Sequence, residues 1–341
     1  MITAGVVGAS GYLGGELLRL LLGHPQIEVA AAVSTRMPGR RIDTAHPNLR
    51  NATDLRFCSE DRLPDCDVLL LAAPHRETMR ILPRLAERAK TVIDLSGDFR
   101  LADPAAYQRY YGVPHEAPEL LGEFVPGCPE LYRDRLRTAD RIAVPGCMAT
   151  AAILALTPLV EAGLIAPEVE VDARTGSSGS GATAGPQNLH AERSGALRVF
   201  STGGHRHEAE IAAACGVRPR MTATGVEAVR GVQVVCRTTP ARELTEPEVR
   251  AAYRRRYAGE PFVRVVAHRR GIYRLPEPKI LLGANYCDVG FALDPDGGRL
   301  LAVAALDNLV KGGAGGAVQS LNVRMGWPER LGLEFTGIHP L

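Results

Sequence analysis

The sequence has almost no excess of charge of either sign. It contains 40 lysines and arginines against 38 aspartates and glutamates, a formal net charge of +2. This near-neutral balance argues against nucleic acid as a partner. The longest apolar run, residues 148–160, is too short to cross a bilayer and contains a threonine and a proline. The N-terminus shows no basic segment followed by a cleavage site. We expect a soluble, cytoplasmic protein without a membrane partner.

Paired cysteines are missing as well. The seven cysteines are an odd number, and no two of them are spaced as CxxC. This pattern indicates free thiols in a reducing compartment and argues against a disulfide framework or a zinc site. The chain has neither an internal repeat nor a low-complexity tail. Its composition is 45% apolar and 23% charged, as in ordinary globular proteins, and its 341 residues are enough for two domains.

Basic residues do cluster locally, in YRRRY (253–257) and HRR (268–270). The simpler interpretation of both clusters is a solvated face. The alternative is a contact surface for an acidic partner. The residues alone leave both interpretations open.

The first half of the chain alternates apolar runs with helical patterns. Apolar runs occupy residues 2–7, 27–33, 67–73 and 91–95, and helical spacing is found at 13–22 and 76–89. Continuous apolar runs separated by helices are typical of buried parallel strands. We therefore predict a doubly wound, Rossmann-type α/β domain.

The second half has a different pattern. Runs typical of strands occupy residues 168–173, 221–229, 232–237, 286–293 and 300–305, and the last two flank the turn sequence DPDGG. They predict an α+β domain with a mostly antiparallel sheet. Residues 307–325 have helix-compatible spacing, and we expect them to pack back onto the first domain. The expected domains are 1–147 with 306–341, and 148–305.

A glycine-rich loop joins the first strand to the first helix. In VVGASGYLGGELL, Gly8, Gly11 and Gly14 are spaced G-x-x-G-x-x-G, one residue off the common dinucleotide fingerprint. Glycines permit a close approach to a pyrophosphate, and the helix N-terminus supplies free N–H groups. A tight turn without a ligand is the alternative. Because a strand precedes the loop and a helix follows it, we favour a cofactor site that also includes Ser10, Tyr12 and Leu13.

The end of the second strand selects between the two nicotinamide cofactors. An acidic residue there holds the ribose of NAD, but this chain offers Ser34, Thr35 and Arg36, and no acid before Asp43. A hydroxyl and a guanidinium suit the additional phosphate of NADP. We therefore expect the first domain to bind NADP through Ser34 and Arg36.

Cys147 stands between a short apolar run and an alanine-rich helical stretch, in AVPGCMAT. The positive end of a helix dipole favours the thiolate form of a cysteine in this place. Ligands of doubly wound sheets also bind at the carboxyl ends of the strands. The alternative is a small buried thiol, and we accept that interpretation for the other six cysteines.

A thiolate nucleophile needs a proton-transfer partner, and the segment RVFSTGGHRHEAEI contains two histidines. His205 and His207 stand in a glycine-flanked loop before a predicted helix. One alternative is that they are ordinary loop histidines. Another is that the two histidines bind a metal ion, but no cysteine or acidic residue at a typical ligand spacing supports a metal site. Nearby arginines make the segment cationic, which suits a phosphate or carboxylate substrate.

Two further segments carry small or charged side chains. TGSSGSGATAG (175–185) is either a flexible linker or an anion-binding nest. LSGDFR (95–100) supplies Ser96, Asp98 and Arg100 just after a predicted strand. It is either an ordinary loop or part of the ligand-binding edge of the sheet.

Five of these segments together resemble one family, the N-acetyl-gamma-glutamyl-phosphate reductases and their close relatives. They are GASGYLGGEL, DLSGDFRL, PGCMAT, GHRHEAEI and DNLVKGGAGGAVQSLN (307–322), in this order over nearly the whole chain. The resemblance implies that NADPH reduces an acyl phosphate to an aldehyde. Cys147 would form a thioester with the acyl group, and a histidine would transfer the proton. It also implies a homodimer or homotetramer.

The resemblance implies roles for single residues as well. His205 is the favoured acid–base group, because Arg198 precedes it by seven residues, as in the related aspartate-semialdehyde dehydrogenases; His207 remains an alternative. The family pattern KGAAGQAVQ is KGGAGGAVQ here, so Gly316 lacks a glutamine side chain. The implied substrate contacts are Ser96, Arg100, Arg198 and Glu210. The implied cofactor contacts outside the glycine loop are Ser177, Gly179 and Asn308.

A finer resemblance concerns the substrate. Residues 177–207, 257–266 and 322–341 look most like the lysine-biosynthetic branch, in which 2-aminoadipate 6-phosphate is amide-linked to a small acidic amino-group carrier protein. Such a carrier would explain the arginine clusters. The alternatives are the same reaction on N-acetylglutamyl phosphate for arginine biosynthesis, both substrates, an NADP-binding sensor without turnover, and a metal-dependent hydrolase.

Overall fold

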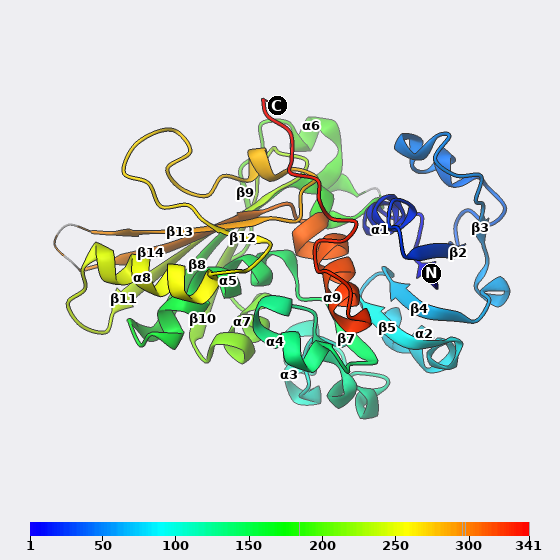
Figure 1. The fold of residues 1–341 in the computed structure, drawn as a ribbon, viewed down its shortest axis with the longest axis horizontal. Helices are drawn as coiled ribbons and strands as arrows, with labels where there is room; N and C mark the ends of the chain where they lie inside the picture. Colours follow the sequence, from blue (N-terminus) through cyan, green and yellow to red (C-terminus); the bar gives the residue numbers. More distant parts are fainter. Residues whose placement is uncertain (184, 295, 297, 341) are drawn as a thin grey trace. The chain divides into compact units, whose positions relative to one another are not determined.

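The chain forms two units in the computed structural model, and each unit has its own seven-stranded sheet (Figure 1). The structure describes residues 1–183, 185–294, 296 and 298–340. Unit 1 consists of Met1–Pro145, Gly181–Thr183 and Gly313–Glu334. Unit 2 consists of Gly146–Ser180, Ala184–Gly312 and Phe335–Leu341. Within the described residues, no helix has both the length and the apolar character needed to cross a membrane.

The sheet of unit 1 is entirely parallel, with the order β3-β2-β1-β4-β5-β7-β6. The order reverses at β1 and β4, so right-handed crossovers place α1 and α2 on opposite faces. The predicted doubly wound fold is confirmed. The strands are β1 (Ile2–Val7), β2 (Ile27–Val33), β3 (Phe57–Cys58), β4 (Cys66–Leu71), β5 (Ala89–Asp94), β6 (Val125–Pro126) and β7 (Arg141–Ala143). The helices are α1 (Tyr12–Leu22), α2 (Thr78–Leu85), α3 (Pro104–Tyr111), α4 (Pro129–Leu136) and α9 (Gly315–Met325).

Helix α2 begins two residues later than the sequence pattern predicts. Arg76 has a φ of 70°, in the left-handed region that a helix cannot use. Its backbone N–H donates to Asp98 Oδ1 at 2.8 Å, and the N–H of Met79 donates to Asp98 Oδ2 at 3.0 Å. Because Asp98 lies on the loop after β5, this start of the helix depends on a tertiary contact that local spacing does not report.

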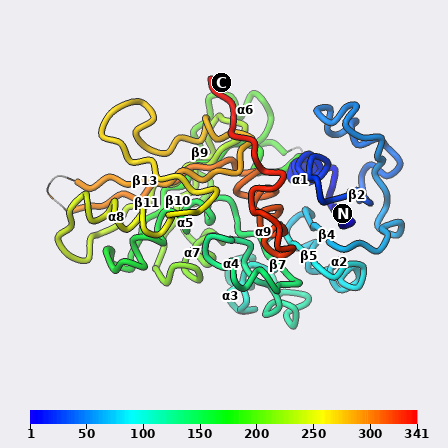
Figure 2. The backbone as a smooth tube through the Cα atoms, in the orientation of Figure 1, coloured from blue at the N-terminus to red at the C-terminus, as the bar shows by residue number. Residues whose placement is uncertain are grey.

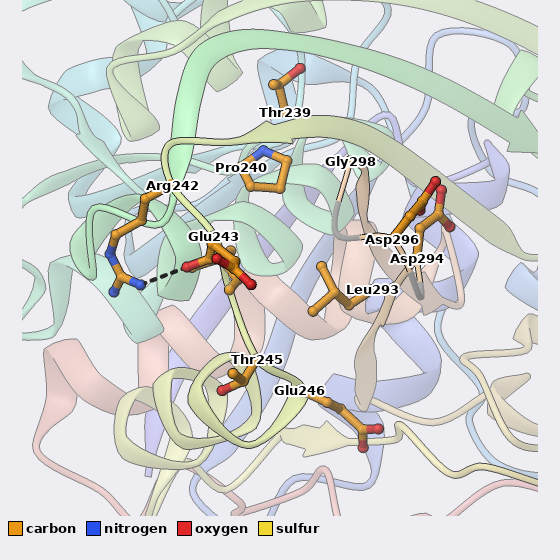
Figure 3. Close-up of a pocket in the computed structure, with 11 residues that line it drawn as sticks. Thr239, Pro240, Arg242, Glu243, Thr245, Glu246, Leu293, Asp294, Asp296 and Gly298 are labelled. Carbon is orange, nitrogen blue, oxygen red and sulfur yellow. Dashed lines mark hydrogen bonds between the residues drawn. The ribbon is translucent and has the colours of Figure 1, made fainter.

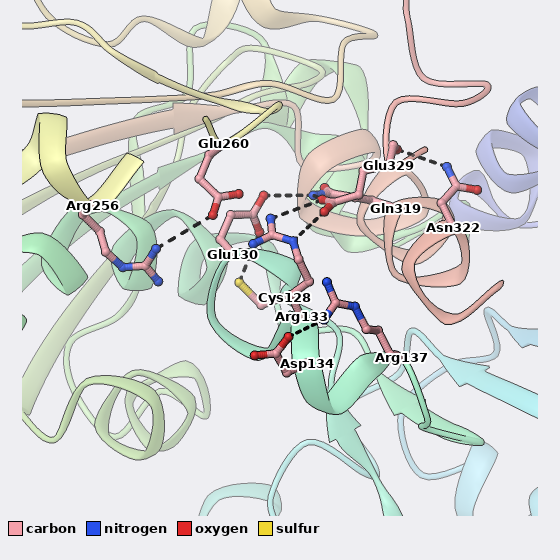
Figure 4. A network of polar contacts seen from close by, with 10 residues as sticks. All are labelled: Cys128, Glu130, Arg133, Asp134, Arg137, Arg256, Glu260, Gln319, Asn322 and Glu329. Atoms are coloured by element: carbon pink, nitrogen blue, oxygen red, sulfur yellow. Dashed lines mark hydrogen bonds and ion pairs between the residues drawn. The ribbon is translucent and has the colours of Figure 1, made fainter. Parts of the chain in front are cut away.

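Helix α9 packs beside α1 and α4 of the same unit (Figure 2). A network of polar side chains joins this C-terminal segment to α4 (Figure 4). Gln319 Nε2 donates to both Glu130 Oε1 and Glu329 Oε2 at 3.1 Å, and Arg133 Nε donates to Glu329 Oε1 at 2.5 Å. Glu130 and Gln319 are buried. Because a buried carboxylate without partners is costly, the network holds α9 in one arrangement against α4.

The sheet of unit 2 has the order β12-β13-β14-β11-β8-β10-β9 and is mostly antiparallel, as predicted. Only the pairs β12–β13 and β8–β10 are parallel among the described strands. The strands are β8 (Ile165–Thr175), β9 (Arg198–Ser201), β10 (Arg218–Gly225), β11 (Val232–Pro240), β12 (Val263–Val265), β13 (Cys287–Leu293) and β14 (Leu300–Leu306). The helices are α5 (Cys147–Glu161), α6 (His190–Arg193), α7 (His207–Cys215) and α8 (Glu246–Tyr257).

Strand β10 ends at Gly225, although the apolar pattern predicts a strand to residue 229. The carbonyls of Ala228 and Val229 accept hydrogen bonds of 2.9 Å from the N–H groups of Ser177 and Ser178. These residues therefore pair with a loop instead of a neighbouring strand. The prediction was wrong here because an apolar run does not report its hydrogen-bond partner.

Helices α5, α7 and α8 pack on the sheet of unit 2, α5 against its central strands, α7 against β10 and α8 against β12 and β13. Helix α8 also explains the YRRRY cluster. Tyr253 and Tyr257, four residues apart, are buried, and the Tyr253 hydroxyl donates to the carbonyl of Ala155 at 2.7 Å. Arg254 and Arg255 lie on the exposed side of the same turn. The cluster is thus the last turn of an amphipathic helix.

An open depression of about 720 Å³ lies where β11 ends and β13 and β14 are joined (Figure 3). Its described lining includes Glu243, Glu246, Asp294 and Asp296, and neither a cysteine nor a histidine. Arg242, at its edge, is paired with Glu248. The described lining therefore contains neither the thiol nor the imidazole that the sequence predicts for the active site.

A fully buried carboxyl group ends β5. Asp94 Oδ1 accepts the N–H of Ser96, and Oδ2 accepts its hydroxyl, both at 2.9 Å. Burial raises the pKa of Asp94 to about 7, an effect that the Ser96 hydrogen bonds oppose and the charge of Asp98 reinforces. This group therefore titrates near neutral pH inside the folded protein.

Two matched substitutions test the network between α4 and α9. Replacing Glu329 by alanine removes the acceptor of Arg133, and we expect the free energy of unfolding to fall by about 1–3 kcal/mol. Asp134 pairs with Arg137 at 2.7 Å in an exposed position of the same helix (Figure 4). Replacing Asp134 by alanine should cost less than about 0.5 kcal/mol. Urea unfolding measures both, and equal losses would contradict the assigned role of the network.

Replacing Asp94 by asparagine should change how stability depends on pH. A carboxyl group with a raised pKa binds more protons in the folded state than in the unfolded state, so the wild-type protein loses stability as pH rises from about 4 to about 7. Asparagine does not ionise and keeps an acceptor for the Ser96 N–H. The stability of D94N relative to wild type should therefore rise between about pH 4 and about pH 7 and level off above that range, measured by urea unfolding. A constant difference would contradict the raised pKa.

Candidate active site

Two of the three glycines in the G-x-x-G-x-x-G spacing are required by close contacts where β1 passes into α1. Gly8 has a φ of 75°, and a Cβ on it would lie 2.5 Å from the Ala72 carbonyl oxygen. A Cβ on Gly14 would lie 2.4 Å from the Gly8 carbonyl oxygen. Gly11 is different, because its φ is −82° and the nearest atom to a Cβ would be 3.4 Å away. The fold thus does not require glycine at Gly11, and its missing side chain leaves the N-terminus of α1 uncapped, which fits a pyrophosphate.

Ser10 and Ser34 meet beside this loop, with their hydroxyl oxygens 2.8 Å apart. Ser34 is buried, and its oxygen also accepts the N–H groups of Arg36 and Met37 at 3.3 and 3.2 Å. Its hydroxyl therefore shapes the turn that presents Arg36, whose side chain is exposed. Tyr12 and Leu13 begin α1, Tyr12 exposed and Leu13 half-buried.

The first acidic residue after β2 is already paired. Arg41 hydrogen-bonds both oxygens of Asp43 at 3.2 Å, and this contact lowers the pKa of the Asp43 carboxyl. An acid that binds a ribose diol must offer its oxygens to the ligand. The paired carboxylate is therefore poorly suited to NAD.

Ser96 and Arg100, two of the expected substrate contacts, lie on the loop after β5. Ser96 is buried and bonded to Asp94. Arg100 Nε donates to the carbonyl of Val144 at 2.8 Å, and Nη2 donates to the carbonyl of Leu95 at 3.0 Å. In this structure Arg100 therefore holds the backbone that follows β5 and β7.

Cys147 is the first residue of α5, and its surroundings are packed through two glycines. A Cβ on Gly312 would lie 2.5 Å from the Cys147 Cβ, and a Cβ on Gly146 would lie 2.0 Å from His207 Nε2. No other residue fits either place without displacing the thiol-bearing turn or the imidazole. The glycines of PGC and DNLVKGG thus allow α5, α7 and the segment after β14 to meet at Cys147.

The two histidines and Glu210 complete this cluster in unit 2. The His205 and His207 rings are 4.5 Å apart and nearly perpendicular, and His205 Nδ1 accepts the His207 backbone N–H at 3.2 Å. Glu210 Oε2 accepts the N–H of Gly146 at 2.8 Å, and Oε1 lies 3.9 Å from His207 Nε2. All three side chains are almost completely buried. The sequence marked Glu210 as a substrate contact, and the structure places it on the backbone next to Cys147.

Asn308 holds two loops of unit 2 together. Its Nδ2 donates to Ser178 Oγ at 2.9 Å, and its Oδ1 accepts the N–H of Gly231 at 2.7 Å. Ser177 is half-buried and Gly179 is exposed on the same loop as Ser178. Arg198 lies on β9, where its guanidinium donates to the carbonyl of Glu192 at 3.0 Å.

The remaining cysteines are less suited to chemistry. Cys128, Cys215, Cys236 and Cys287 are buried, and burial raises the pKa of Cys215 to about 12. Cys58 and Cys66 are half-buried, and desolvation raises the pKa of both thiols. In the part of the chain that the structure describes, no group of three or more histidine, cysteine and acidic side chains is placed to hold a metal ion.

Sequence reasoning missed two buried carboxylates near the predicted site residues. Asp94 holds Ser96, and Glu208 bonds to the backbone of Gly204 and Met221. Both acids were visible in the quoted segments. Their burial and their partners follow only from the packing of segments that are distant in sequence.

Comparison with known proteins places the chain in one family. Residues 3–139 match the family model of the semialdehyde dehydrogenase NAD binding domain, and residues 147–308 match that of the semialdehyde dehydrogenase dimerisation domain. The first match, together with the glycine loop, identifies a nicotinamide dinucleotide as the cofactor.

Individual relatives agree with these matches. The chain is 49% identical to a putative [LysW]-L-2-aminoadipate 6-phosphate reductase of Thermomicrobium roseum, with 100% of both chains covered. It is 46% identical to the [LysW]-L-2-aminoadipate 6-phosphate reductase of Deinococcus radiodurans, covering 99% of this chain and 98% of that one. The fold resembles aspartate semialdehyde dehydrogenase II of Vibrio cholerae, with a TM-score of 0.72, 16% identity and 96% and 98% coverage. The chain thus belongs to the semialdehyde dehydrogenase family of oxidoreductases.

Proposed function

We propose that this protein reduces the acyl phosphate of carrier-linked 2-aminoadipate 6-phosphate to the semialdehyde, with NADPH as the hydride donor. The single observation that carries the proposal is the cluster around Cys147, the first residue of α5. His207 lies against the preceding Gly146, whose N–H donates to Glu210, and His205 lies against His207. The substrate follows from the names of the two relatives, which match this chain over its full length.

The geometry suits covalent catalysis by Cys147. The thiolate attacks the acyl carbon, the bond to phosphate breaks, and a thioester forms on Sγ. A reduced nicotinamide cofactor held by unit 1 would supply the hydride needed to reduce the thioester carbon. The resulting thiohemiacetal would collapse to the aldehyde as the C–S bond breaks, releasing the Cys147 thiolate and returning the hydroxyl proton to the histidine that supplied it. Gly146 and Gly312 support this role, because Gly146 lets His207 approach the thiol-bearing turn and Gly312 lets the segment after β14 approach Cys147.

His205 is the proposed proton-transfer group. Because its Nδ1 accepts a backbone hydrogen bond, the neutral ring carries its proton on Nε2. From Nε2 the ring can donate to the substrate oxygen that becomes negative when the hydride arrives. His207 packs on Gly146 and lies beside Glu210, which suits an orienting role next to Cys147.

NADP is the proposed cofactor form. The exposed Arg36 at the end of β2 suits a ribose phosphate, and Asp43 is engaged by Arg41. Ser10 and Ser34 would shape the turn, while Gly8, Gly11 and Gly14 would admit the pyrophosphate to α1. Ser177, Gly179 and Asn308 are proposed to face the nicotinamide half. A homodimer or homotetramer is proposed from the dimerisation-domain match.

The carrier protein is proposed to dock on the arginines of α8. Arg256 is 19% exposed and paired with Glu161 at 2.9 Å, so it contributes to folding. Arg254 and Arg255 are exposed, and no ion pair to a described residue involves them. Two unneutralised guanidinium groups on one helical turn suit an acidic protein surface.

A reverse assay tests the function. Purified protein should reduce NADP⁺ only when phosphate and the carrier-linked aminoadipate semialdehyde are both present, with NAD⁺ a poorer acceptor. N-acetylglutamate semialdehyde should give a lower kcat/KM by at least about tenfold, because it lacks the carrier. A preference for N-acetylglutamate semialdehyde would assign the enzyme to arginine biosynthesis, and binding of NADP⁺ without turnover on either aldehyde would favour a sensor.

In the same assay, Cys147→Ser should lower kcat by at least about 1000-fold, because a hydroxyl is a far weaker nucleophile than a thiolate at this pH. NADP⁺ affinity, measured by fluorescence titration, should be unchanged. Cys58→Ser changes a half-buried thiol of unit 1 and should leave kcat unchanged. Full activity of C147S would rule out the thioester route.

The docking proposal predicts a change in KM alone. Replacing Arg254 and Arg255 by alanine should raise KM for the carrier-linked substrate by about threefold or more at low salt and leave kcat unaltered, because the charges steer association. The control replaces exposed Arg50 and Arg109 of unit 1 by alanine, which removes the same net charge. An unchanged KM, or an equal rise in the control, would remove this surface from the docking site.

A further inference from the structure

The first turn of α7 contains a buried glutamate that the proposed reaction does not use. Glu208 is 8% exposed, and its Oε1 accepts two backbone hydrogen bonds. One comes from the N–H of Gly204 at 3.1 Å and the other from the N–H of Met221 at 2.8 Å. Glu208 therefore ties the loop that leads into His205 to strand β10.

The end of β9 explains why β10 offers this N–H. Strand β9 stops at Ser201, which lies opposite Ala223 on β10. Met221 is two residues before Ala223, so its N–H points to the same edge of β10. The pairing of β9 with β10 has therefore ended before Met221. The Glu208 carboxylate accepts the Met221 N–H in place of a backbone carbonyl of β9.

The loop before His205 has little packing to hold it. Gly203 and Gly204 have φ values of 152° and 67°, and among the described residues nothing lies within 4 Å of where a Cβ on either would be. A glycine pair is the most flexible backbone available. The conformation of the loop therefore depends on hydrogen bonds. The bond from Gly204 to Glu208 joins the loop to the sheet, because the same oxygen of Glu208 also accepts the N–H of Met221.

The position of the His205 ring follows from this loop. The ring is anchored through its Nδ1 on the N–H of His207 and lies against the His207 ring, which packs on Gly146 next to Cys147. A shift of the Gly204 peptide moves the Cα of His205 and with it Nε2. A misplacement of about 1 Å between reacting groups can lower a rate by about 100-fold.

We propose that Glu208 is a positioning residue for proton transfer by His205, acting through the N–H of Gly204. This inference rests on the proposed function. Two glutamates of one helical turn then hold the backbone on either side of the proposed site. Glu210 accepts the N–H of Gly146, the residue before Cys147. Glu208 accepts the N–H of Gly204, the residue before His205. Both partners of Glu208 are neutral N–H groups, so the loop needs an acceptor at the right distance more than it needs a charge.

Two substitutions separate distance from charge. Glu208→Gln keeps the length of the side chain and an acceptor oxygen, and its kcat should stay within about twofold of wild type. Glu208→Asp keeps the charge but is one methylene shorter, so one oxygen cannot reach both N–H groups. Its kcat should fall by about 10- to 100-fold, with KM for both substrates changed less than about twofold. Glu123→Ala, at an exposed position of unit 1, is the control.

Amide hydrogen exchange gives a readout that does not require activity. Exchange in a peptide covering residues 202–206 should accelerate in Glu208→Asp and remain at the wild-type rate in Glu208→Gln and Glu123→Ala. Thermal unfolding of each variant shows whether the fold is retained.

Three results would overturn the proposal: unaltered kcat in Glu208→Asp, a loss in Glu208→Gln as large as that in Glu208→Asp, or wild-type exchange in Glu208→Asp. If the wild-type protein turns over neither the carrier-linked aminoadipate semialdehyde nor N-acetylglutamate semialdehyde, the proposed function is wrong. The exchange measurement still tests the contact between Glu208 and Gly204 in that case.

Discussion

The close approach of backbone and side chains around the start of α5 is the constraint on which the proposed site depends. His207 lies where a side chain on Gly146 would be, and Cys147 lies where one on Gly312 would be. A single methyl group at either position would separate the nucleophile from the imidazoles or from the segment after β14. The densely packed interior offers no room to absorb such a change. The chemistry proposed for Cys147 thus depends on the absence of side chains at Gly146 and Gly312.

Buried carboxylates hold the segments that meet around Cys147. Glu210 binds the backbone before Cys147, Glu208 binds the backbone before His205, and Asp307 binds the N–H groups of Leu309 and Gly283. A carboxylate is a strong acceptor for N–H groups that lie outside helices and strands, and such groups are costly to bury without a partner. In unit 1, Asp94 and Asp98 have the same function at the end of β5. The loops around the proposed site are therefore fixed by hydrogen bonds to carboxylate oxygens and not by apolar packing.

The parallel sheet of unit 1 could be predicted because its strands are buried on both faces and therefore appear as unbroken apolar runs. The run at 67–73 corresponds to β4, and that at 2–7 to β1. Two short strands of unit 2 were not predicted. Strands β9 and β12 have four and three residues, too few for an alternating pattern to stand out, and each is defined by the strand that it pairs with. The sequence did not decide the role of the arginine cluster at 253–257. The structure identifies it as the last turn of α8, because its two tyrosines are buried on one side of the helix.

The sequence by itself determined the fold class and the glycine loop, and it singled out the side chains of the proposed reaction. These features depend on local periodicity or on residue types that few other roles require. Only the tertiary structure decided which backbone groups Glu208, Glu210, Asp94 and Asp307 bind, and why Gly146 and Gly312 carry no side chain. The physical reason is that each of these contacts joins residues from different elements. Steric exclusion and hydrogen-bond satisfaction act between positions in space, and a linear pattern does not contain those distances.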